Sequence, residues 1–178
     1  KEVTDNFEKF ELGIALSKVY DFIWNELCDW YIELIKPVFY HGTDEEKGVS
    51  YRVIRDVLIT SLKVLHPTMP FITEEIYSFL KDEKTIMKAP WPMVNESFID
   101  EKIEDSMGGV IEAIKSIRNL RQEMNVPNKR RSTLYILPNQ GKKESFEASK
   151  EYLIKLAYAD EVVFITEDPK DEQNVSLV

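Results

Sequence analysis

Basic side chains gather in one segment of an otherwise acidic chain. The sequence has 178 residues, with 23 Lys and Arg against 32 Asp and Glu, and a net charge of −9. Between Met107 and Lys143, however, eight basic residues stand against the two acids Glu112 and Glu123, so this segment carries +6. A phosphate backbone responds to such a local face rather than to the net charge. Contact with a polyanion and an ordinary solvated face are both open for these residues: Lys115, Arg118, Arg121, Lys129, Arg130, Arg131, Lys142 and Lys143.

A second candidate binding region follows the polar loop 41–48. Tyr51 can stack on an unpaired base, and Arg52 and Arg55 can pair with phosphates or stack as planar cations. We expect these three side chains in the first two turns of a helix that starts after the loop, where the helix dipole is positive. Tyr40, on the other side of the loop, has the same stacking chemistry.

No arrangement that could catalyse a reaction is recognisable. His41 and His66 lack neighbouring ligands at metal-binding spacing, and we interpret them as a solvated loop residue and a hydrogen-bonded corner residue. Cys28 is expected to be a buried small hydrophobic residue. Glu74 and Glu75 suit the first turn of a helix, which favours negative charge. Because a glycine-rich phosphate loop is also missing, we predict no catalytic, cofactor-binding or metal-binding residue.

Apolar residues recur every three or four positions through the first two-thirds of the chain, which is the period of one helix face. Trp24 and Trp30 are expected mainly in the core, Pro37 is expected to end the first helix, and Gly108-Gly109 predicts a kink or close packing in the last. Prolines around Trp91 predict an extended strap over 88–92. The helices are expected at about 7–36, 49–65, 71–80 and 100–123.

The period changes to two after Pro127. Strands are expected at 133–137 and 161–166, a short helix at 145–157, and the start of a third strand at 175–178. The fold class is therefore mainly α: an antiparallel helical bundle over 1–128, followed by a small α+β appendage over 129–178 that we expect to be incomplete.

The composition also limits the cellular environment in which we expect the protein. A single cysteine rules out an internal disulfide. The apolar stretches are too short to span a membrane, and the polar start, Lys1–Asp5, does not read as a signal peptide. We therefore expect a soluble, cytoplasmic protein without membrane contact.

Four segments together resemble the anticodon-binding domain of class I valyl-tRNA synthetases, in order and in spacing. The resemblance covers about residues 10–137 well and the remainder loosely. The segments are Ile23–Glu33, which resembles the hallmark helix of that domain, the corner Leu65–Glu75, the strap Pro90–Pro92, and the helix exit Ile117–Pro127.

The resemblance implies a fragment of a C-terminal region that binds tRNA, in particular tRNA(Val), while its parent enzyme attaches valine using ATP and Mg²⁺. The fragment itself is expected to be inactive, because the adenylation motifs of the family do not occur in it. The remaining domains of the synthetase are the other expected partners, and we expect a monomer. The residues expected to bind tRNA are Tyr51, Arg52, Arg55, Arg118, Arg121, Lys129, Arg130 and Arg131.

Three alternatives accompany this interpretation. The equivalent domain of an isoleucyl- or leucyl-tRNA synthetase shares the bundle, although its corner differs from His66–Phe71. A helical protein-interaction module without RNA binding would suit the net charge of −9. Arg118 and Arg121 could also pair with acids such as Asp29 or Glu33 instead of RNA.

Overall fold

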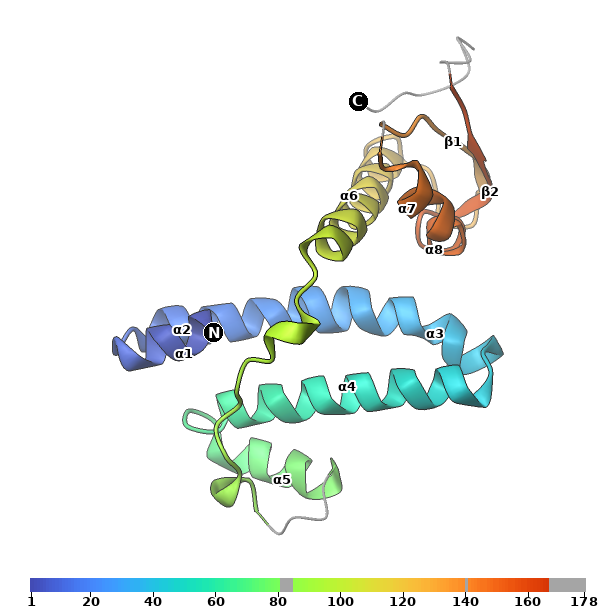
Figure 1. Cartoon of the computed structure of the whole chain (residues 1–178). Coiled ribbons are helices and arrows are strands. Elements are labelled where there is room, and N and C mark those ends of the chain that lie inside the picture. Colours follow the sequence, from blue (N-terminus) through green and yellow to red (C-terminus); the bar gives the residue numbers. More distant parts are fainter. Residues whose placement is uncertain (81–84, 140, 167–178) are drawn as a thin grey trace. The chain divides into compact units, whose positions relative to one another are not determined.

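The computed structural model describes residues 1–80, 85–139 and 141–166. The described chain is mainly helical, as the sequence predicts, and it forms two compact units, Lys1–Glu96 and Ser97–Val178 (Figure 1). The boundary predicted near residue 128 falls inside the second unit, and the division into 1–128 and 129–178 stays a prediction. None of the described helices is long and apolar enough to cross a membrane.

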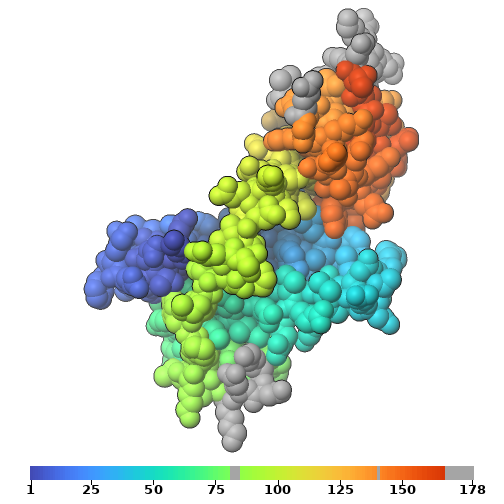
Figure 2. Space-filling model, viewed as in Figure 1, coloured from blue at the N-terminus to red at the C-terminus, as the bar shows by residue number. Residues whose placement is uncertain are grey.

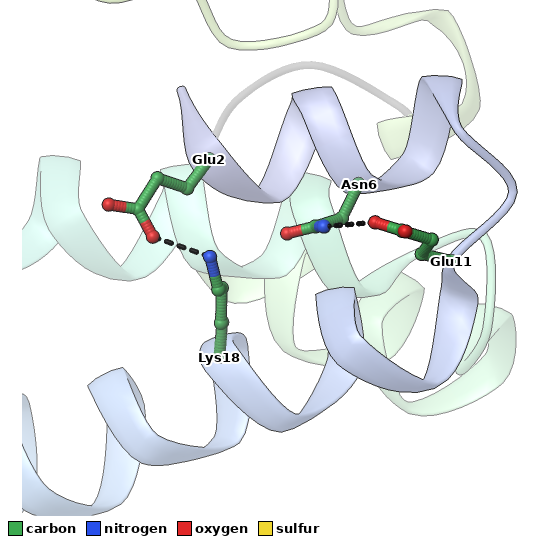
Figure 3. Close-up of polar contacts among 4 residues, drawn as sticks. All are labelled: Glu2, Asn6, Glu11 and Lys18. Carbon is green, nitrogen blue, oxygen red and sulfur yellow. Dashed lines mark hydrogen bonds and ion pairs between the residues drawn. The ribbon is translucent and has the colours of Figure 1, made fainter.

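The first unit opens with a helical hairpin. Helix α1 (Glu2–Glu8) turns back onto α2 (Leu12–Asp21) through Phe10, whose φ is +60°. Two polar contacts clasp the pair: Lys18 Nζ lies 2.5 Å from Glu2 Oε2, and Asn6 donates to Glu11 over 2.6 Å (Figure 3). The hydrogen bond from Lys18, with its positive charge, lowers the pKa of the Glu2 carboxyl.

The helix predicted over 7–36 is in fact several elements. After α2 come the π-helix η1 (Phe22–Tyr31) and α3 (Ile32–His41). The prediction that Pro37 ends this helix is wrong, because α3 continues to His41. An interior proline loses one backbone hydrogen bond, but α3 packs along α4 and buries Ile35, and this tertiary contact holds the extra turn.

Helix α4 (Asp44–Leu65) begins five residues before the predicted start at Val49, and it runs beside α2, η1 and α3 (Figure 1). The loop predicted over 41–48 is therefore much shorter. The helix starts early because Thr43 and Glu46 form a capping box at its N-terminus. Glu46 N donates to Thr43 Oγ1 over 3.3 Å, and Thr43 N donates to Glu46 Oε2 over 2.8 Å. A side chain at Gly42 would meet the carbonyl oxygen of Val38 at 2.6 Å, so this tight connection requires glycine.

The corner after α4 is fixed by His66. Its Nδ1 lies 2.7 Å from Thr73 Oγ1, and its Nε2 lies 3.0 Å from Met87 Sδ, which confirms the predicted corner hydrogen bond. Helix α5 (Pro70–Leu80) follows, with proline at the first helical position. The 3₁₀ turn η2 (Ile86–Lys88) then packs against α5. Lys88 therefore belongs to a helical turn, and only residues 89–92 of the predicted strap lie outside helices.

Glu74 does not have the role expected from its sequence position. Because α5 begins at Pro70, Glu74 lies past the first turn, and the predicted interaction with the helix dipole is wrong. Its carboxylate instead accepts hydrogen bonds from Thr85 Oγ1 (3.0 Å) and from Ile86 N (3.3 Å). Beside these contacts lies the local core, made of Ile59, Leu62, Tyr77 and Ile86.

The strap beyond η2 is anchored by Trp91. The indole Nε1 donates to Thr4 Oγ1 over 3.0 Å, and the ring meets Phe7 edge-on at 5.7 Å between centroids. Trp30 is buried, which confirms that prediction. Trp24 and Cys28 are exposed, so their predicted burial is wrong. Trp24 instead stacks on Tyr20, with 6.2 Å between ring centroids and 4° between ring planes.

The second unit packs one long helix against a small α/β layer. After the 3₁₀ turn η3 (Glu96–Phe98), helix α6 (Glu101–Glu123) runs without interruption through Gly108-Gly109, and the Lys142 side chain lies 3.4 Å from where a Cβ of Gly109 would be. Asp100 caps the helix, accepting hydrogen bonds from Lys102 N and Ile103 N. Nothing lies within 4 Å of where a Cβ of Gly108 would be, and the neighbour of Gly109 is the flexible end of a lysine, so the structure shows no close packing that requires either glycine.

Strand β1 (Ser132–Ile136) pairs in parallel with β2 (Ala159–Phe164), and α7 (Lys143–Ala148) and α8 (Lys150–Leu156) form the crossover. The single helix predicted over 145–157 is divided at Ser149. The expected third strand at 175–178 lies outside the described residues. In Figure 2 the crossover and β2 form one compact orange mass. The most buried apolar side chains of this unit are Val110, Ile114, Leu153 and Val162.

Replacing Trp30 and Trp24 in turn should show which of the two tryptophans contributes to the core. Trp30→Ala should lower the free energy of unfolding by about 3–5 kcal/mol, because it removes a buried indole. Trp24→Ala is the matched control and should cost no more than about 1.5 kcal/mol, the upper value of an aromatic pair. Urea unfolding followed by circular dichroism measures both, and equal losses would contradict the assigned core.

The capping box should make α4 sensitive to acid. Hydrogen bonds from the backbone and hydroxyl of Thr43 lower the pKa of the Glu46 carboxyl from its ordinary value of 4.5. A carboxyl whose pKa is lower in the folded state stabilises the fold above that ordinary value, and this contribution is lost as the pH falls through the folded value. Glu46→Ala should therefore be less stable than the parent at pH 7 and should approach it at pH 3.

Glu45→Ala removes the same charge from the first turn of α4 and leaves the capping box intact, so it is the control for Glu46→Ala. Urea midpoints at both pH values give the comparison. If the two variants showed the same dependence on pH, the capping box would not be the cause.

Candidate nucleic-acid interface

The first predicted binding region lies on the middle of α4. Because the capping box starts this helix at Asp44, Tyr51 and Arg52 lie about two turns into it, and the expectation that they flank the positive helix end is wrong. The first turn instead carries three acids, Asp44, Glu45 and Glu46. Tyr51 is 56% exposed and Arg52 is exposed, so both side chains can reach a ligand. Their predicted role in binding would therefore depend on the side chains themselves and not on the helix dipole.

Arg55 is already engaged within the fold. Its Nε and Nη2 donate to the carbonyl oxygen of Leu80 over 3.0 and 2.6 Å, which ties α4 to the C-terminal end of α5. Nη1 also lies 3.9 Å from a carboxylate oxygen of Asp56. Helix C-terminal carbonyls favour positive charge, so this arginine has a structural task that the sequence did not indicate.

The second predicted region surrounds the exit of α6, where the helix ends in a Schellman motif. Asn125 has a left-handed backbone with φ of +55°. Its N–H donates to the carbonyl of Gln122 over 3.0 Å, and Val126 N–H donates to the carbonyl of Arg121 over 2.8 Å. Asparagine tolerates this conformation better than other non-glycine residues, and Pro127 stops further helix. The turn directs the chain back across the last turn of α6.

The arginines of the last turns of α6 donate to backbone carbonyls, Arg121 to the returning chain and Arg118 to the end of α8. Arg121 Nη2 donates to the carbonyl of Pro127 over 3.2 Å and, more closely, to that of Arg130. Arg118 Nε donates to the carbonyl of Leu156 over 2.7 Å. Both arginines therefore donate to backbone carbonyls within the second unit. Glu33, one of the acids expected as their partner, pairs with Lys36.

Both arginines also lie over the ring of Tyr158, with their guanidinium carbons 5.7 and 5.9 Å from its centroid. Tyr158, at the corner between α8 and β2, has a φ of +56°. This left-handed conformation costs a non-glycine residue roughly 1–2 kcal/mol. The sequence analysis missed Tyr158, because nothing in the local sequence distinguishes a left-handed tyrosine from one in a loop.

A cleft opens beside this stack. Its volume is about 480 Å³, and it is entirely within the second unit. Among the described residues that line it none is acidic, and its walls combine two guanidinium groups, three amides, one phenol and two apolar residues. The lining residues are Arg118, Arg121, Gln122, Asn125, Val126, Pro127, Asn128 and Tyr158.

The last three predicted residues follow the cleft directly in sequence. Lys129, Arg130 and Arg131 are exposed. Arg131 Nη1 donates to the carbonyl of Ala159 over 3.1 Å and so links the start of β1 to that of β2. The structure thus brings Arg118, Arg121 and the following basic run together around one loop.

The described residues hold no group of three or more His, Cys, Asp or Glu that could bind a metal ion. The groups that the arrangement does offer are suited to recognition. Exposed cations can pair with phosphates, an exposed tyrosine can stack on a base, and amides beside a guanidinium stack can accept and donate hydrogen bonds.

Comparison with known proteins places this arrangement in a family. A family model described as the anticodon-binding domain of tRNA ligase matches residues 1–136. Over the full chain, the sequence is 51% identical to the valine–tRNA ligases of Clostridium acetobutylicum and Clostridium perfringens, and over 99% of the chain it is 36% identical to that of Enterococcus faecalis. The chain spans about a fifth of the length of these curated relatives. It therefore belongs to the family of anticodon-binding domains of tRNA ligases, in the form that valine–tRNA ligases carry.

Proposed function

We propose that this chain holds the anticodon arm of tRNA(Val) for a valine–tRNA ligase, which joins valine to that tRNA with the use of ATP and Mg²⁺. The observation that carries the proposal is the exposed basic loop at the exit of α6, in a chain that matches an anticodon-binding family. The domain contributes binding energy and orientation, so that the acceptor end of the tRNA meets a distant catalytic site. ATP and Mg²⁺ act elsewhere in the ligase, in the cytoplasm.

The two regions divide this task by their chemistry. Lys129 and Arg130 are exposed charges that neutralise phosphates irrespective of sequence. Tyr51 and Arg52 offer a stacking face and a planar cation, which suit the splayed bases of an anticodon loop. The other arginines act mainly by fixing the backbone that carries these contacts, since each donates to a carbonyl oxygen: Arg55, Arg118, Arg121 and Arg131.

The remaining domains of the ligase are the second proposed partner, and a monomeric enzyme is the proposed assembly. Helix α5 exposes Phe71 and Phe79 by 90% and 80%, and Ile72 and Ile76 lie on the same side at helical spacing. Exposed apolar patches of this kind mark interaction surfaces. Four-fifths of the length of the relatives lies outside this chain, so a neighbouring part of the same polypeptide is the occupant we propose.

Removing the exposed charges should change the salt dependence of tRNA binding. Lys129→Gln combined with Arg130→Gln should weaken binding of a tRNA(Val) transcript, and each lost phosphate contact should reduce the log–log salt slope by roughly 0.7–0.9. A filter-binding titration over increasing KCl measures the slope. The control is Lys102→Gln with Lys150→Gln, two exposed lysines elsewhere in the same unit. An unchanged slope, or an equal change in the control, would refute the assignment.

Substitutions of Arg52 and Arg55, which are neighbours on α4, should have different effects: one on tRNA discrimination and the other on stability. Arg55→Ala removes charged hydrogen bonds to the carbonyl of Leu80, and it should lower the free energy of unfolding by about 1.5–3 kcal/mol. Arg52→Ala should change stability by less than about 0.5 kcal/mol but should reduce discrimination between valine and non-valine anticodons. Urea unfolding and competition binding with two tRNAs give the two readouts. Intact discrimination in Arg52→Ala would remove this residue from the interface.

A further inference from the structure

The cleft at the exit of α6 is more than part of a basic surface. Simple phosphate binding needs cations alone, but three amide side chains, Gln122, Asn125 and Asn128, line this cleft beside the arginines. An amide offers both donors and an acceptor, and base edges present the same two functions. Val126 and Pro127 add apolar wall, which suits the face of a planar ring. The cleft volume of about 480 Å³ is in the range of small-molecule sites.

The positive wall of the cleft is held rigidly. Two backbone carbonyls fix the guanidinium of Arg121, and the ring of Tyr158 lies beneath it. The Nε of Arg121 is buried and has no hydrogen-bond partner among the described residues. An unsatisfied buried donor is rare and needs a physical explanation. The buried Nε–H is out of reach of a ligand, but the guanidinium keeps its positive charge, and an anionic group bound in the cleft would interact favourably with that charge.

Backbone strain is concentrated at the same place. Asn125 and Tyr158 both have left-handed conformations, and both line the cleft, although they come from different helix ends. Strained residues of this type are frequent at ligand sites, where the strain fixes a geometry in advance. The left-handed turn at Asn125 places an amide at the mouth of the cleft, and the turn at Tyr158 places a ring under two guanidinium groups.

We propose that this cleft binds one unstacked nucleotide of an RNA chain, with its phosphate next to Arg121 and its base next to the amides of Asn125 and Asn128. This inference rests on the proposed binding of tRNA and adds a base-reading pocket to it. Lys129 and Arg130, which directly follow the cleft residues, meet the phosphates on either side of that nucleotide.

The test is a pair of amide deletions that preserve the backbone. Asn125→Gly keeps the left-handed turn, because glycine adopts it without strain, and Asn128→Ala removes the second amide from an exposed loop. Asn119→Ala, which deletes an exposed amide of α6 outside the cleft, is the matched control. The probes are a tRNA(Val) transcript and a fully paired RNA duplex, and near-ultraviolet circular dichroism verifies the fold of each variant.

The double variant should bind the tRNA about tenfold more weakly than the parent, as expected for the loss of contacts to one base. Its salt slope and its affinity for the duplex should be unchanged, since the phosphate contacts remain, and the control should bind as the parent does. If the parent binds tRNA and the double variant binds it equally well, the pocket is refuted while the proposed function stands. A parallel loss of tRNA and duplex affinity would reduce the cleft to a phosphate site and overturn the inference. A parent that binds neither RNA would refute the proposed function itself.

Discussion

The bonding of Arg121 to the loop that follows its own helix is the interaction on which the candidate interface depends. The carbonyl of Arg121 accepts the hydrogen bond that closes the Schellman turn, and its guanidinium holds the carbonyls of Pro127 and Arg130. One residue thus ends α6, reverses the chain and fixes the first part of the path to β1. Hydrogen bonds to a charged donor are each worth about 1.5–3 kcal/mol, whereas the exposed lysine beside them contributes little to stability. The geometry of the basic loop is therefore set by an arginine whose Nη2 already donates to the backbone, while Lys129 and Arg130 carry the exposed charges beside it.

This arrangement explains how an acidic chain can present a basic site. Arginine suits the internal role, because its planar fork can donate to more than one carbonyl at once and it remains charged when partly buried. Lysine is a flexible point charge and suits the outer position at 129. The net charge of −9 does not oppose binding. Screening limits the reach of each exposed charge to about 8–10 Å at physiological salt. Close to the exit loop, the described walls of the cleft contain no acidic side chain.

Helical periodicity was sufficient to predict the mainly helical fold, the run of α6 and the strands, because those features depend on local spacing. Boundaries were less accurate where a local motif competed with a breaker residue. Gly48 suggested a loop, but the capping box of Thr43 and Glu46 had already started α4. Trp24 and Trp30 are six residues apart and therefore lie on different faces of a helix, and only Trp30 is buried. Pro37 is tolerated because of packing against α4, which no local pattern reports.

The predicted tRNA-binding residues stay a prediction, and their sequence could not show which of them bond within the fold. Charge counting finds arginines and lysines, yet the acceptors of Arg55, Arg118 and Arg121 are backbone carbonyls outside their own helical turns, which composition cannot reveal.

In the proposed function, the two regions would bind RNA through different forces. On α4, the first turn of the helix carries three acids, so in the proposed function phosphates gain little there, and stacking on Tyr51, which salt screens weakly, would carry the recognition. At the exit of α6, exposed cations adjoin the cleft, so the proposed affinity there would depend on counterion release. In the proposed binding, stacking on α4 and the amides of the cleft would each discriminate between bases, and the exposed cations of the loop would supply the salt-dependent part of the affinity.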